Sequence, residues 1–139
     1  MSSARFAFDS RLRLKTGWEF DTVFRTGRQQ RGELVRVYFV NSGQAADKDD
    51  RPRVGVTVGR KIAGAALRSR GRRMLRETAR RLMPWVKNGV WFVLSLRERG
   101  LESDAVAVYG DAAKQLSRAG LLRDDWGGAD WSVDERPSS

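Results

Sequence analysis

The run Arg60–Arg81 constrains the fold more than any other part of the chain, because it combines dense positive charge with an apolar face. It holds nine Arg or Lys residues and a single acid, Glu77. At 3.6 residues per turn, its small and apolar residues fall within an arc of about 100°. These residues are Leu67, Gly71, Met74, Leu75, Thr78 and Leu82. The pattern predicts a helix over about residues 65–83 that buries one side and presents guanidinium groups on the other, a surface suited to polyanions such as nucleic acids.

The positive charge is concentrated in this run rather than spread over the chain. The 139 residues, enough for one domain with a core, carry a formal charge of +10. The run Arg60–Arg81 accounts for +8 of it, whereas residues 101–139 carry −4. From this composition we expect a flexible basic arm over residues 1–12, one folded domain over 13–122 and an acidic, disordered tail over 123–139.

Two residue types are missing from the chain, and this limits its chemistry. There is no Cys and no His, which excludes disulfides, thiolate nucleophiles, zinc fingers, Ser–His triads and histidine acid–base catalysis. Residues 1–10 lack the apolar segment of a signal peptide, and no apolar run approaches the ~20 residues of a membrane span. We expect a cytoplasmic protein that binds no membrane and no small-molecule substrate.

Capping residues and periodicity predict the first helix. Thr16 and Glu19 have the spacing of a capping box, and Gly27 is expected to end the helix in a left-handed conformation. One face of this helix carries Phe20, Val23 and Phe24. Residues 28–32 are predicted to form a polar, basic turn.

Alternating side chains predict a strand over residues 34–40. One face of it carries Val35, Val37 and Phe39, and the other carries Leu34, Arg36, Tyr38 and Val40. A second strand is predicted over residues 53–58. The short connection between the two favours an antiparallel hairpin.

The second half of the chain predicts one more strand and one more helix. Pro84 is expected to end the basic helix, and a buried strand follows over residues 90–96. Ser103 is expected to cap a helix over about residues 104–119. The inner face of that helix carries Val106, Tyr109, Ala113 and Leu116. The order α-β-β-α-β-α predicts a single-domain α+β sandwich, with a small central sheet and helices packed mainly on one face.

This order and several segments resemble the protein component of bacterial ribonuclease P. The signature of that family is a basic helix with an Arg-Asn-Arg core, preceded by a basic pair. Here Arg60-Lys61 and Arg68-Ser69-Arg70 occupy those positions, with Ser69 in place of the Asn. Further matches are Arg13-Leu14-Lys15, Phe20, Val23, Phe24, Gly27, Val37-Tyr38-Phe39-Val40 and the strand Arg53–Val58. The similarity covers about residues 11–122.

The resemblance implies a protein subunit of a ribonucleoprotein endoribonuclease, which removes the 5′ leader from precursor tRNA by phosphodiester hydrolysis. In that family the RNA is the catalyst and uses Mg²⁺. We therefore expect no catalytic residue and no metal ligand in this chain, and Mg²⁺ bound mainly by the RNA. The expected partners are the catalytic RNA and precursor tRNA, with one copy of a monomeric protein on each RNA.

The resemblance also implies two sets of contact residues. By matching positions, the catalytic RNA is expected to contact Arg60, Lys61, Arg68, Ser69, Arg70, Arg72, Arg73 and Arg76. The leader is expected to lie in a cleft between the first helix and the sheet, in contact with Arg13, Lys15, Phe20, Phe24, Arg36 and Tyr38. Aromatic side chains are stacking surfaces for single-stranded RNA. Simple core packing is the alternative for the three aromatic residues.

Three rival functions are open from the residues alone. A general basic RNA-binding protein, such as a ribosomal protein or an RNA chaperone, would show the same charge pattern without a catalytic partner. A DNA-binding protein would place the basic helix in a major groove, but this helix lacks Asn and Gln base readers. A protein-only nuclease would need carboxylates to converge on a metal ion. Its candidates, Asp47, Asp49, Asp50, Asp124 and Asp125, lie in segments typical of solvated loops.

Overall fold

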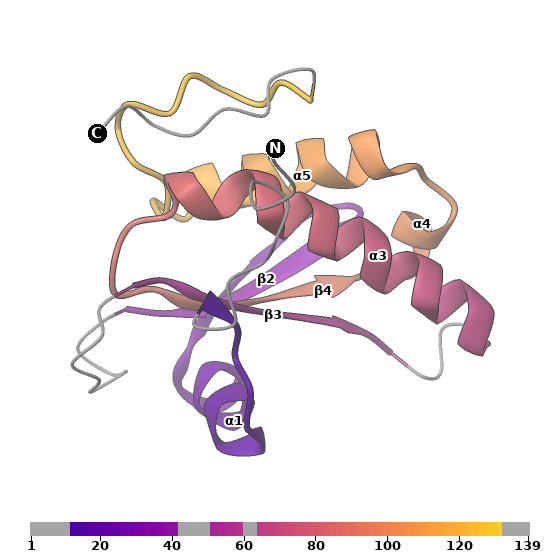
Figure 1. The fold of residues 1–139 in the computed structure, drawn as a ribbon, viewed down its shortest axis with the longest axis horizontal. Coiled ribbons are helices and arrows are strands. Elements are labelled where there is room, and N and C mark those ends of the chain that lie inside the picture. The colour runs from indigo at the N-terminus through magenta and orange to yellow at the C-terminus, as the bar shows by residue number, and fades with distance from the viewer. Residues whose placement is uncertain (1–11, 42–50, 60–63, 132–139) are drawn as a thin grey trace, which may run out of the picture.

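The structure is a computed structural model that describes residues 12–41, 51–59 and 64–131. Its elements are α1 (Gly17–Thr26), β1 (Arg28–Arg31), β2 (Val35–Val40), β3 (Arg53–Val58), α3 (Ala65–Leu82), the 3-10 helix η3 (Met83–Trp85), β4 (Trp91–Leu96), α4 (Glu98–Leu101) and α5 (Ala105–Arg118). The predicted α+β class is confirmed, since one four-stranded sheet carries the helices (Figure 1). Nearly all of the predicted basic arm, Asp47, Asp49 and Asp50 lie outside the described residues.

The strands are arranged in the order β1-β2-β4-β3. The pairs β1–β2 and β2–β4 are antiparallel, and β3–β4 is parallel. The predicted hairpin between the strands near residues 34–40 and 53–58 is therefore wrong, because β4 lies between them. Five of the six residues of β4 are buried. A strand that is apolar on both faces belongs in the interior of a sheet, and this burial outweighs the short connection between β2 and β3.

The predicted polar turn over residues 28–32 is also wrong, because most of it is strand β1. Arg28 lies opposite Phe39, and Arg31 lies opposite Arg36. All four residues of β1 are polar, and β1 is an edge strand with only one neighbour. Charged residues suit an exposed edge, but they give no alternation that marks a strand in the sequence.

Helices cover both faces of the sheet (Figure 1). On one face α3 and α5 enclose the larger core, which includes Val35, Val37, Leu75, Phe92, Leu94 and Leu116. On the other face α1 covers a smaller core of Leu14, Val23, Val40, Trp91 and Val93. The prediction that helices pack mainly on one face is thus correct for α3 and α5, whereas α1 takes the opposite face.

The predicted helices are present, with two corrections at their ends and one on the inner face of α5. The capping box at Thr16 is confirmed, but Gly27 is extended, with φ −82°. It is needed there for space, since a Cβ atom would lie 2.3 Å from the carbonyl oxygen of Val23. The cap of α5 is Asp104, one residue after the predicted Ser103. Val106 is 49% exposed and does not belong to the inner face of α5.

The chain beyond α5 continues along the helical layer as far as Trp131. Its ring lies 5.6 Å from that of Tyr109 and 3.9 Å from the Arg81 guanidinium carbon. Arg81 Nη1 also donates a hydrogen bond of 2.7 Å to the Trp131 carbonyl oxygen. Residues 132–139, the rest of the predicted acidic tail, lie outside the described residues.

Candidate nucleic-acid interface

The basic helix α3 packs its small and apolar stripe against the sheet and α5. The buried residues of α3 are Gly71, Met74, Leu75, Thr78, Ala79 and Leu82. They match the predicted stripe, except that Leu67 is 50% exposed. Because the stripe faces inward, the remaining circumference of α3, which carries most of its arginines, faces solvent (Figure 1).

The structure places six of the predicted RNA-binding residues on the solvent-facing side of α3. Ser69, Arg70, Arg73 and Arg76 are exposed, and Arg68 and Arg72 are partly buried. Within the described ranges, Arg73 and Arg76 have no hydrogen bond or ion pair. Arg60 and Lys61 lie outside the described residues. This exposed set from Arg68 to Arg76 is called the α3 surface below.

Two arginines of the α3 surface are held by neutral groups. Arg70 Nη1 donates to the Leu101 carbonyl oxygen at 2.9 Å, and its Nη2 donates to the Ser103 carbonyl oxygen at 3.0 Å. Arg72 Nη2 donates to Ser69 Oγ at 3.2 Å. These acceptors orient the guanidinium groups without neutralising them, so the positive charge stays available to a polyanion.

The last turn of α3 is different, because Glu77 pairs with both of its arginines and compensates one of the two positive charges. Its carboxylate accepts hydrogen bonds from Arg80 Nε at 3.1 Å and from Arg81 Nε at 2.9 Å. The pKa of Glu77 is lowered below 4.5, chiefly by the hydrogen bond from Arg80. Partial burial raises the pKa, whereas the hydrogen bond from Arg81 and the charges of both arginines lower it further. Among the described residues, the arginines of α3 that form no ion pair with a carboxylate therefore end at Arg76.

A second candidate surface lies on the opposite face of the sheet, where α1 meets β2. The rings of Phe20 and Phe24 are stacked with centroids 6.5 Å apart, and Phe24 meets Tyr38 edge-on at 4.8 Å. Arg36 Nη1 donates to the Tyr38 hydroxyl oxygen at 3.1 Å. Arg36 and Tyr38 thus share one face of β2, as the alternation predicts. These four residues are called the aromatic surface below.

The three aromatic rings are not equally accessible. Phe24 is 43% exposed. Phe20 and Tyr38 are partly buried and pack against the smaller core. Phe20 covers Gly55 of β3, where a Cβ atom would lie 2.4 Å from the ring. Phe20 and Tyr38 therefore contribute to core packing as well as to the aromatic surface. Phe24 has the most exposed ring of the three.

Glu19 fixes the orientation of α1 on the sheet. Its Oε1 accepts hydrogen bonds from the backbone N–H groups of Lys15 at 2.6 Å and Thr16 at 2.9 Å. Its Oε2 accepts one from Arg53 Nη1 of β3 at 2.8 Å. Burial raises the pKa of Glu19, but the two backbone hydrogen bonds and the Arg53 charge outweigh burial and lower the pKa below 4.5.

Arg13 and Lys15 lie at the other end of α1 from Phe24. Arg13 forms a parallel bridge with Val54, and the Leu14 N–H donates to the Val54 carbonyl oxygen at 3.0 Å. The side chains of Arg13 and Lys15 are exposed. The predicted leader-binding residues therefore form two groups, a cationic one at the edge of β3 and an aromatic one over β2.

A polar row beside Tyr38 was not predicted. Arg31 pairs with Arg36, Arg36 pairs with Ser95, and Ser95 pairs with Thr57. Cross-strand partners project from the same face of a sheet, so Arg31, Ser95 and Thr57 extend the aromatic surface. Only the sheet register reveals this row, because Arg31 belongs to the strand that the sequence pattern did not indicate.

Trp18 is a further residue that the sequence analysis missed. It is 65% exposed, and its ring meets Trp91 edge-on at 5.9 Å. The aromatic residues predicted on α1, Phe20 and Phe24, belong to its apolar stripe, and Trp18 lies off that stripe. A large exposed ring on a polar helix face was the available signal.

Among the described residues, no group of three or more Asp or Glu side chains is placed to hold a metal ion. Asp125 is paired with Arg123 at 2.9 Å, and Asp124 is exposed. None of the described helices is long and apolar enough to cross a membrane.

Comparison with known proteins connects these surfaces to a family. The family model described as Ribonuclease P matches residues 8–120. The chain belongs to the ribonuclease P protein family. The ribonuclease P protein component of Symbiobacterium thermophilum is 33% identical over 113 residues, which cover 80% of this chain and 93% of that relative. The component from Bacillus cereus is 30% identical with the same coverage.

Solved structures of ribonuclease P proteins share the fold. The protein from Thermotoga maritima is 26% identical, with a TM-score of 0.65 over 76% of this chain and 96% of that one. The protein from Staphylococcus aureus is 19% identical, with a TM-score of 0.69 over 81% of this chain and 98% of that one. The predicted family and the predicted fold class are confirmed.

Proposed function

We propose that this chain binds the catalytic RNA of ribonuclease P through the α3 surface and the 5′ leader of precursor tRNA through the aromatic surface. Its family makes it a protein component of a ribonucleoprotein endoribonuclease that acts in tRNA 5′ maturation. The observation that carries the proposal is the placement of the two surfaces. They lie on opposite faces of one sheet (Figure 1), so two RNA segments can be held at once.

The α3 surface supplies the electrostatic part of this function. Folded RNA brings phosphates close together, and arginines that contact them replace condensed cations. Arg73 and Arg76 are exposed and form no ion pair among the described residues, so their charge is available to a phosphate. The expected consequence is a lower Mg²⁺ requirement for the RNA when the protein is bound.

The aromatic surface supplies the preference for precursor over mature tRNA. Each base stacked on an aromatic ring contributes roughly 1–3 kcal/mol, with little dependence on sequence. Phe24 offers an open ring, and Arg36 lies beside Tyr38, where a backbone phosphate can meet its charge. Mature tRNA lacks the leader, so it gains nothing from these contacts.

We assign the bond-breaking chemistry to the RNA subunit and its bound Mg²⁺. The chain has no His and no Cys, which leaves it without the usual proton-transfer and nucleophilic side chains. Its own contribution is binding and positioning. We further propose that one monomer binds each RNA in the cytoplasm.

The deciding experiment is cleavage of a 5′-extended precursor tRNA by a bacterial ribonuclease P RNA at low Mg²⁺, with and without this protein. We expect efficient cleavage only when both components are present. An RNA that gains nothing from a tightly bound protein would contradict the proposal. It would favour the alternative, a general basic RNA-binding protein with no catalytic partner.

Replacement of α3 charges is the matched test of the binding mode. Arg73→Gln with Arg76→Gln should weaken binding to the catalytic RNA and reduce the salt dependence of that binding. The control is Arg25→Gln with Lys87→Gln, which removes two exposed charges from elsewhere. Equal effects of the two double variants would indicate non-specific attraction instead of a defined α3 contact.

A further inference from the structure

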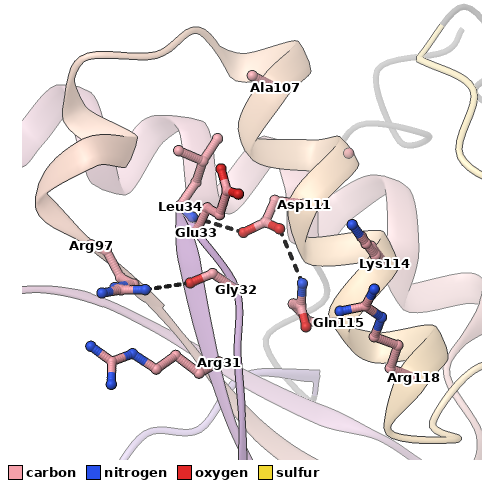
Figure 2. Close-up of a pocket in the computed structure, with 11 residues that line it drawn as sticks. Arg31, Gly32, Glu33, Leu34, Arg97, Ala107, Asp111, Lys114, Gln115 and Arg118 are labelled. Carbon is pink, nitrogen blue, oxygen red and sulfur yellow. Dashed lines mark hydrogen bonds between the residues drawn. The ribbon is translucent and has the colours of Figure 1, made fainter.

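An open groove of about 570 Å³ lies between the β1–β2 turn and α5. It is away from the α3 surface, and it shares Arg31 with the row that extends the aromatic surface. Figure 2 shows its walls, with Arg31 and Arg97 on the side of the turn and Lys114 and Arg118 on α5. The groove is at the β1 edge of the sheet, where α5 contacts β1 and β2. Helix α3 instead contacts β3 and β4, so the groove and the α3 surface are on different sides of the domain.

Asp111 holds the two walls of the groove together. Its Oδ2 accepts hydrogen bonds from the backbone N–H groups of Leu34 and Val35, both at 2.9 Å. Its Oδ1 accepts a hydrogen bond of 3.1 Å from Gln115 Nε2 (Figure 2). Gly32 leaves room for the carboxylate, since a Cβ atom there would lie 2.3 Å from it. The groove is therefore a fixed feature of the fold.

The groove has a net positive charge, because four cations and two carboxylates line it. Lys114, Arg118 and Arg31 are exposed and form no ion pair with any carboxylate of the described residues. Arg97 Nη1 donates to the Gly32 carbonyl oxygen at 2.6 Å, a neutral acceptor. Asp111 accepts three neutral N–H donors, which orient its carboxylate without cancelling its charge. Glu33, the other lining carboxylate, has no bonded donor among these residues.

The groove also contains a polar atom that lacks a partner. Gln115 is 2% exposed, and its Oε1 accepts no hydrogen bond from the described residues. Its amide nitrogen is fixed by Asp111, so the amide oxygen is directed away from that carboxylate (Figure 2). A buried acceptor without a donor costs free energy. This oxygen is closed to solvent, so it belongs to the wall of the groove and not to its open surface.

We propose that this groove binds the sugar-phosphate backbone of an RNA strand, as a third contact of the protein with the ribonuclease P ribonucleoprotein. The proposal rests on the proposed function. Lys114 and Arg118 are one helical turn apart, so neighbouring phosphates can each meet a cation. Phosphates repeat at a regular spacing along an RNA strand, whereas the carboxylates of an acidic protein do not.

The first test is the salt dependence of binding to the catalytic RNA. Lys114→Gln with Arg118→Gln should lower the slope of log K against log salt by about 1.5, since each lost phosphate contact contributes about 0.7 to 0.9. Affinity at 0.15 M salt should fall about tenfold. Both side chains are exposed, so thermal melting should show unchanged folding. Arg25→Gln with Lys87→Gln removes the same charge elsewhere, and an equal loss in that control would overturn the proposal.

The second test locates the RNA. The chain has no Cys, so a single introduced Cys can carry an iron–EDTA group that cleaves nearby RNA. We expect the probe at Lys114→Cys to cut RNA positions different from those cut by a probe at Arg73→Cys. Cuts from Arg73→Cys but none from Lys114→Cys would refute the groove contact and leave the proposed function intact. No cuts from either probe would count against the proposed function itself.

A third arm separates RNA from a small anion. Inorganic phosphate is titrated into the protein while amide resonances of α5 are followed. Saturable shifts around Lys114 and Arg118, together with an unchanged RNA salt slope in the double variant, would assign the groove to a free anion and overturn the RNA proposal.

Discussion

At the scale of single residues, the side chains of the two proposed surfaces are held in different ways. Arg70 and Arg72 are oriented by carbonyl and hydroxyl oxygens and keep their full charge. The position of Phe24 depends on α1, and α1 in turn depends on the hydrogen bonds of Glu19. One buried carboxylate at the start of α1 therefore supports an aromatic contact at its other end.

We predict that Glu19→Gln lowers the free energy of unfolding by about 1–3 kcal/mol at pH 7, because it breaks a partly buried ion pair with Arg53. The pKa of Glu19 is lowered in the folded state. Its contribution is therefore fully present above the unfolded pKa and is lost as pH falls through the folded pKa. Urea unfolding at pH 7 and pH 3 should show a difference between variant and parent that shrinks at pH 3. A difference independent of pH would contradict this assignment.

We predict that Phe24→Ala weakens binding of precursor tRNA by the reconstituted enzyme about 5- to 30-fold, the equivalent of about 1–2 kcal/mol of lost stacking. Binding of mature tRNA should not change, since it has no leader. Asp21→Ala, at an exposed position of the same helix, is the control. Equal losses for precursor and mature tRNA would show that Phe24 supports α1 and does not stack on the leader.

At the scale of elements, the features that depend on neighbouring residues in the chain were predicted correctly. The capping box of α1, the alternation of Arg36 and Tyr38, and the stripe of α3 apart from Leu67 are confirmed. The pairing of β3 with β4 was not predictable, because it depends on which strand is buried on both faces. The row through Arg31 was missed for a different reason. β1 is a polar edge strand, and only its pairing with β2 identifies it as a strand.

Two helical glycines give a matched prediction with opposite signs. Gly71 of α3 is buried, and a Cβ atom there would lie 2.9 Å from Leu96, 3.0 Å from Val58 and 3.1 Å from Leu101. We predict that Gly71→Ala destabilises the protein by about 1 kcal/mol, because this crowding exceeds the gain in helix propensity. Gly110 of α5 has no atom within 4 Å of such a Cβ. Gly110→Ala should stabilise by about 0.5–1 kcal/mol. Chemical denaturation measures both, and equal signs would refute the packing argument.

At the scale of the whole molecule, uncompensated positive charge lies on more than one side of the domain. The α3 surface and the groove beside α5 both carry cations that form no ion pair among the described residues. In contrast, Arg81 at the end of α3 is covered by Trp131 and shares the Glu77 carboxylate with Arg80. The family match ends at residue 120, so the segment that covers Arg81 lies beyond the matched region.

We predict that Trp131→Ala lowers the free energy of unfolding by about 1–3 kcal/mol, since it removes a cation–π contact and an aromatic pair. Trp131→Phe keeps a ring beside Tyr109 and Arg81 and should lose less than half as much. Thermal unfolding of both variants is the measurement. An unchanged melting temperature for Trp131→Ala would show that the contacts of Trp131 contribute nothing to the stability of the domain.

The strand order also sets the sequence of events in synthesis. β1 and β2 are neighbours in the chain and can pair as a hairpin while the rest is still being made. β3 has to wait for β4, its parallel partner, and all of α3 is translated in between. Parallel pairing across such a crossover is slow. The arginine-rich helix therefore leaves the ribosome before the strand that fixes it. The insertion of β4 pairs β3 with the rest of the sheet, and α5, which follows β4, completes the larger core.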